Sequence, residues 1–144
     1  MIAPEQTQRF QRMETAAPIL AARFQSLSRA HAYFQREGGL RSISVSGVLD
    51  NGSIEATFQG VRIKFEPLLI FGNDRSPRTR VLCLQCHCSY GHPVQEVLGS
   101  FTYAESGETD LNPDMDGNFP RMDTDAPGIV LHFLDAAFHA NRVI

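Results

Sequence analysis

Apolar residues recur at intervals of three and four over the first quarter of the chain. This spacing places them on one face of an α-helix. Pro18 lies inside the pattern and predicts either one kinked helix or two helices, with Thr15 as a cap of the second. Gly38 and Gly39 can adopt the left-handed conformation that often ends a helix. The residues that share the apolar face are Phe10, Met13, Ala17, Leu20, Phe24, Leu27, His31 and Phe34.

The next part of the chain alternates between apolar and polar residues, which is typical of half-buried strands. Asn51-Gly52 and Gln59-Gly60 separate three such runs, and each dipeptide predicts a two-residue hairpin turn. The first turn would pair Val45 with Phe58 and the second would pair Phe58 with Val61, so the apolar side chains share one face. The three predicted strands are residues 42–49, 54–58 and 61–71.

Pro67 interrupts the third of these strands and has no amide hydrogen, so the strand lies at a sheet edge there or contains a bulge. The run from Leu68 to Phe71 is apolar on both sides and predicts burial on both faces. A fifth strand is expected over residues 96–103, with Val97, Gly99, Phe101 and Tyr103 on one face.

The stretch between them, Arg80 to Tyr90, predicts a fourth and central strand that contains all three cysteines. Its even positions form one apolar row, consisting of Leu82, Leu84, Cys86, Cys88 and Tyr90, and Cys83, Gln85, His87 and Ser89 point the other way. The cysteine spacing does not place four ligands around a metal ion. We therefore expect reduced, small buried residues at these positions.

The last third begins with a long acidic segment, residues 104–125, and ends with a predicted helix over residues 127–142 that Asp125 would cap. Together these patterns predict a single α+β domain over residues 1–144. It has an N-terminal helical arm, a five-stranded antiparallel meander sheet and a C-terminal helix packed on the sheet.

Composition adds a core and a charge asymmetry to this fold. The chain has 144 residues, of which 42% are hydrophobic, enough for one globular core. Eleven basic and seven acidic residues lie up to Arg80, whereas two basic and nine acidic residues follow it. No apolar run is typical of a signal peptide or a membrane span, so we expect a cytoplasmic protein that contacts no membrane.

Part of the acidic segment resembles the calcium-binding loop of an EF-hand. Oxygen ligands are expected at its first, third, fifth and twelfth places, and Asn112, Asp114, Asp116 and Asp123 stand there. Asp123 is shorter than the usual bidentate glutamate, and two prolines restrict the loop. We therefore expect weak calcium binding at most, in a mobile and extended loop.

No catalytic signature is present, so the sequence favours a non-catalytic protein-interaction or adaptor module without a cofactor. The partner is expected to be another protein or a second copy in a homodimer, bound through the N-terminal helix by Phe24, Leu27, His31 and Phe34. Nucleic acid is not expected, because the basic residues form no broad surface. Two alternatives are weak calcium binding and a ligand-binding or enzymatic pocket. The pocket would be lined by Phe58, Phe65, Leu84, Cys86 and Phe101.

Overall fold

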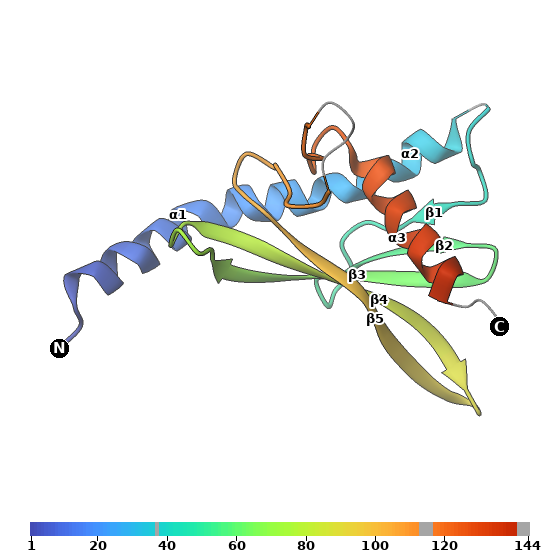
Figure 1. The fold of residues 1–144 in the computed structure, drawn as a ribbon, viewed down its shortest axis with the longest axis horizontal. Coiled ribbons are helices and arrows are strands. Elements are labelled where there is room, and N and C mark those ends of the chain that lie inside the picture. Colours follow the sequence, from blue (N-terminus) through green and yellow to red (C-terminus); the bar gives the residue numbers. More distant parts are fainter. Residues whose placement is uncertain (37, 113–116, 141–144) are drawn as a thin grey trace.

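The computed structural model describes residues 1–36, 38–112 and 117–140 and contains one five-stranded antiparallel sheet, with helices before and after it (Figure 1). The strands lie in the sheet in the order of the sequence, which confirms the predicted α+β fold. In chain order the elements are α1 (Pro4–Gln25), the 3-10 helix η1 (Ser26–Arg29), α2 (Ala30–Gln35), β1 (Ser44–Val45), β2 (Ile54–Phe58), β3 (Val61–Phe71), β4 (Pro77–Ser89), β5 (His92–Tyr103) and α3 (Ala126–Ala140).

The core lies between the sheet and the helices, which pack on one face of it (Figure 1). Phe133 of α3 lies with its ring centroid 5.7 Å from those of Phe65 in β3 and Phe101 in β5. The buried Tyr103 of β5 donates its hydroxyl hydrogen to the main-chain oxygen of Leu20 in α1, at 2.7 Å. No helix among the described residues covers the opposite face of the sheet. None of these helices is long and apolar enough to span a membrane.

The N-terminal helix α1 continues through Pro18, so the single helix of the two predicted arrangements is found. Ala16 and Leu20 are fully buried on either side of the proline, and their packing offsets the backbone hydrogen bond that proline cannot make. The predicted cap at Thr15 is wrong, since its hydroxyl donates to the oxygen of Gln11 within the same helix.

The second predicted hairpin turn is confirmed and the first is wrong. Gln59-Gly60 pairs Phe58 with Val61, as expected. At Asn51-Gly52, in contrast, the Asn51 side chain accepts hydrogen bonds from the amide and hydroxyl of Ser53, which favours a longer loop. Val45 therefore pairs with Ala56 instead of Phe58, and β1 has only two residues. Because the shift is by two residues, the apolar side chains stay on the predicted face.

The faces of β4 are the reverse of the prediction. Cys83 pairs with Phe65 of β3, and directly opposite residues share a face, so Cys83 lies in the core. The predicted apolar row lies on the uncovered face, where Cys86 is half-buried and Cys88 is exposed. Burial raises the pKa of the Cys83 thiol far above its ordinary range, and the nearby Cys86 adds to the rise. We expected all three cysteines to be buried, and only Cys83 is.

An irregularity in the pairing of β4 with β5 divides the residues that were predicted to share one face of the fifth strand. Cys83 pairs with Gly99 but Leu84 pairs with Val97, so Leu98 is an extra residue in a β-bulge. Val97 is therefore on the uncovered face beside Leu84 and is 66% exposed. The predicted pocket wall does not form, because Phe65 lies on the helical face and Leu84 on the other.

Candidate functional site

The side chains predicted to bind a partner on the N-terminal helical run belong mostly to the protein's own core. Phe24, Leu27 and Phe34 are each less than 5% exposed and contribute to the main hydrophobic cluster. His31 is half-buried, and its Nδ1 accepts a hydrogen bond of 3.0 Å from the main-chain amide of Val45. These four residues join the helices to the sheet, and they do not form an exposed binding surface.

Only part of the predicted calcium loop lies in the described ranges, since Asp114 and Asp116 fall outside them. Asn112 is exposed, and Asp123 lies between two arginines. Within residues 1–36, 38–112 and 117–140, no group of three or more His, Cys, Asp and Glu side chains could hold a metal ion.

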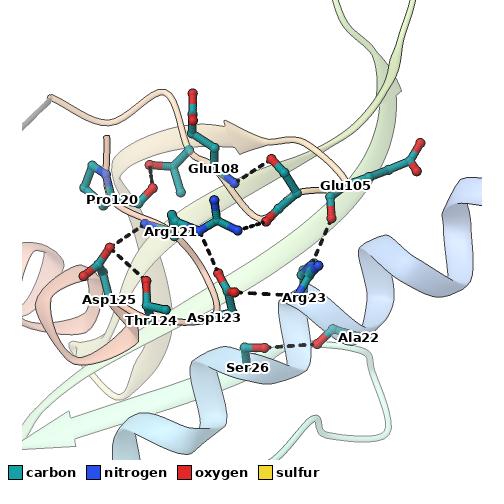
Figure 2. Close-up of polar contacts among 12 residues, drawn as sticks. Ala22, Arg23, Ser26, Glu105, Glu108, Pro120, Arg121, Asp123, Thr124 and Asp125 are labelled. Carbon is teal, nitrogen blue, oxygen red and sulfur yellow. Dashed lines mark hydrogen bonds and ion pairs between the residues drawn. The ribbon is translucent and has the colours of Figure 1, made fainter. Parts of the chain in front are cut away.

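The described part of the acidic segment is folded against α1, contrary to the extended loop that we expected (Figure 2). Arg121 donates from Nε to Asp123 Oδ1 at 3.3 Å and from Nη2 to the oxygen of Ser106 at 2.7 Å. Arg23 of α1 donates to the oxygen of Glu105 at 2.9 Å and lies 3.7 Å from Asp123 Oδ2. The acidic segment is thus anchored to α1 by main-chain and side-chain oxygens.

Two local features permit this packing. Gly107 has a φ of +90°, and a Cβ atom there would lie 3.0 Å from Asp123 Oδ1, so the close approach needs glycine. Partial burial alone would raise the pKa of the Asp123 carboxyl. The hydrogen bond from Arg121 and the charges of Arg121 and Arg23 outweigh this effect and hold the pKa below its ordinary value.

A cavity of about 600 Å³ lies on another side of α1, between this helix, the loop after β1 and the far half of β3. We call it the α1 groove. Its surface is mainly apolar, and Tyr103 is the one titratable group among the described residues that line it. Burial raises the pKa of Tyr103 to about 12, so the phenol stays neutral. The lining residues are Ala17, Pro18, Ala21, Ala22, Phe24, Gln25, Val48, Gly52, Pro67, Leu69, Thr79 and Tyr103.

The sequence explains why this space is open. The helical wall consists largely of alanine, whose side chain is too short to reach the sheet. The neighbouring strand β2 begins at Ile54, which pairs with Phe65, so β2 covers only the first half of the longer β3. The predicted burial of Leu68 to Phe71 on both faces is consequently wrong, since Leu69 is 47% exposed toward the groove.

The edge of β3 beside the groove also has free main-chain groups. Gly72 donates its amide hydrogen to the oxygen of Ser76, so the even positions at this end of β3 face β4. Backbone groups alternate sides along an antiparallel strand, and Leu69 and Phe71 therefore point theirs toward the open edge. Among the described residues, neither makes a main-chain hydrogen bond on that side. Pro67 confirms the sequence signal for an edge, because it offers only its carbonyl.

The groove walls are held in place from both sides. Tyr103 fixes α1 to the sheet through Leu20, and Arg23 fixes the same helix to the acidic segment (Figure 2). Phe10, farther along α1, lies against Phe71 with 6.0 Å between their ring centroids. The groove is therefore preformed, and it combines apolar walls with an unpaired strand edge.

Sequence reasoning did not find the α1 groove, although two signals for it are visible. Pro67 marks the edge, and three alanines at positions 17, 21 and 22 mark the helix surface that leaves room. Comparison of the chain with protein-family models, with curated proteins and with solved structures found no match.

Proposed function

We propose that this protein is an interaction module that binds an extended segment of a partner protein in the α1 groove. The segment adds a strand to the open edge of β3. The observation that supports this proposal is the unpaired edge at Leu69 and Phe71 directly beside an apolar cavity. Strand addition uses main-chain hydrogen bonds for affinity and side-chain pockets for specificity.

The dimensions and chemistry of the groove suit such a ligand. A volume of about 600 Å³ lies within the range of ligand pockets and accommodates several side chains. Side chains of an added strand alternate between the two faces of the sheet, so every second residue would enter the groove. We therefore expect an extended segment with small or medium apolar residues at alternate positions.

Peptide selection followed by matched substitutions tests the proposal. Peptides selected from a random display library on the wild-type protein should bind it, and binding should slow amide hydrogen exchange at Leu69 and Phe71. Leu69→Lys places a charge in the groove and should weaken binding at least tenfold. Leu68→Lys is the control, because Leu68 is the exposed neighbour on the opposite face and its substitution should leave the affinity within about twofold.

Three outcomes would contradict the proposed strand addition. The selection enriches no peptide, the selected peptides bind Leu69→Lys as well as wild type, or they bind without protecting Leu69 and Phe71. A second copy of this chain is the alternative partner, consistent with the expected homodimer through the N-terminal helix. Light scattering at micromolar concentration would then show a dimer for wild type and a monomer for Leu69→Lys.

A further inference from the structure

The face of the sheet opposite the helices carries a diagonal row of four aliphatic side chains. It begins at Leu68 of β3, continues through Leu82 and Leu84 of β4, and ends at Val97 of β5. Leu84 and Val97 are directly paired, and Leu68 pairs with Arg80, the residue two before Leu82. The two ends are exposed, at 63% for Leu68 and 66% for Val97, whereas Leu82 is half-buried and Leu84 is only 6% exposed. We call these four residues the aliphatic row.

The aliphatic row has the length of a short helix. It spans two strand spacings across the sheet and four residues along β4, which gives about 16 Å from end to end. A helix of about 11 residues has the same length. Apolar residues at positions i, i+4, i+7 and i+11 of such a helix form a stripe of four that can lie along the row.

Basic residues flank the aliphatic row on both sides. Arg62 lies next to Lys64 on β3, beyond one side of the row, and Arg78 and Arg80 lie on β4, beyond the other. Lys64 pairs with Glu66 at 3.0 Å, and Arg78 donates to the hydroxyl of Thr102. Arg62 and Arg80 are both exposed, and within the described part of the chain neither lies within 4.0 Å of a carboxylate. Two arginines are thus available to a ligand from opposite sides of the row.

We infer that this face docks an amphipathic helix of a partner protein, with aliphatic residues on the aliphatic row and acidic residues beside Arg62 and Arg80. Charge complementarity selects this partner over a second copy of the chain, because two such faces packed together would bring like charges into contact. It also favours a helix over a membrane surface. Within β3, β4 and β5 no tryptophan or tyrosine of the kind that anchors proteins at lipid interfaces lies on this face, and the apolar residues form a narrow row.

Two designed peptides of about 16 residues test the inference. Both have leucine at i, i+4, i+7 and i+11, and the flanking positions are glutamate in one and lysine in the other. We expect the glutamate peptide to bind and to shift the amide resonances of Leu68, Leu82, Leu84 and Val97 in NMR spectra. The double variant Arg62→Glu/Arg80→Glu should weaken this binding at least tenfold and should bind the lysine peptide instead.

A matched control separates the site from the overall charge. Arg29→Glu/Arg41→Glu makes the same charge change at exposed positions outside this face and should leave the affinity within about twofold. Equal binding of both peptides, resonance shifts away from the row, or equal loss in the two double variants would overturn the inference. Binding to phosphatidylserine vesicles without binding to the glutamate peptide would overturn it in favour of a membrane.

Discussion

At the scale of single residues, Asp123 is the carboxylate of the acidic segment that contacts two arginines. Arg23 reaches it from α1 and Arg121 from the segment itself, so one carboxylate links parts of the chain that are 100 residues apart. A calcium ion that bound Asp123 would have to displace both guanidinium groups. Asp123, which stands at the twelfth place of the EF-hand-like loop, forms ion pairs with arginines in this structure.

The pH dependence of stability should reveal this role. Because the folded-state pKa of Asp123 lies below its unfolded value, the ionised carboxylate stabilises the protein above the unfolded pKa. That contribution is lost as pH falls through the folded pKa. Asp123→Asn should lower the free energy of unfolding by about 1 kcal/mol at neutral pH, and by much less in strong acid. Urea unfolding of both proteins from about pH 7 to about pH 2 measures the difference.

The control for this prediction is Asp135→Asn, which changes an exposed carboxylate of α3 and should follow the wild-type stability closely across the same range. A difference between Asp123→Asn and wild type that stays constant down to strong acid would mean that lost packing, and not the charge of the carboxylate, is responsible.

At the scale of elements, the sequence correctly predicted the strand pair for which the apolar alternation and the connecting turn give the same register. Gln59 and Gly60 both have positive φ, and the register of β2 on β3 follows from that turn. The predicted register of β1 on β2 was wrong because the Asn51 side chain accepts hydrogen bonds from Ser53. Periodicity does not show such local hydrogen bonds, which compete with the predicted turn. The prediction of which face of β4 is buried was wrong because both faces carry apolar residues. Alternation alone could not decide which face the helices cover.

The two-residue strand β1 should depend on a helix for its place in the sheet. Val45 is buried, and its amide donates to His31 Nδ1 at the junction of η1 and α2. His31→Leu removes the acceptor, and leaving the amide unpaired should cost about 1–3 kcal/mol. Amide exchange measured by NMR should accelerate at Val45 more than at Ile63 in the middle of the sheet. His92→Leu, at an exposed position, is the control, and equal acceleration at both amides in His31→Leu would refute the link.

At the scale of the whole molecule, the strand β3 connects the two proposed binding surfaces. Leu69 points into the α1 groove and Leu68, its neighbour, begins the aliphatic row on the opposite face. The periodicity of the sequence predicted neither surface, because the α1 groove combines α1 with the distant strand β3, and the aliphatic row depends on the bulge at Leu98 that turns Val97 to this face. A module with one partner on each face would act as an adaptor, in agreement with the function class that the sequence favours.

This arrangement predicts that the two partners assist each other. From Pro67 to Phe71, β3 has a neighbouring strand on the β4 side only, and a strand added in the α1 groove would hold the segment from both sides. A ligand that orders a segment lowers the cost of ordering it for a second ligand. A saturating groove peptide should therefore raise the affinity for the acidic helical peptide by about fivefold, and the reverse titration must give the same factor. Calorimetry with each peptide, alone and in the presence of the other, measures both factors. Leu69→Lys should abolish the coupling while leaving the affinity for the helical peptide alone unchanged, and independent binding in wild type would show that β3 is already rigid.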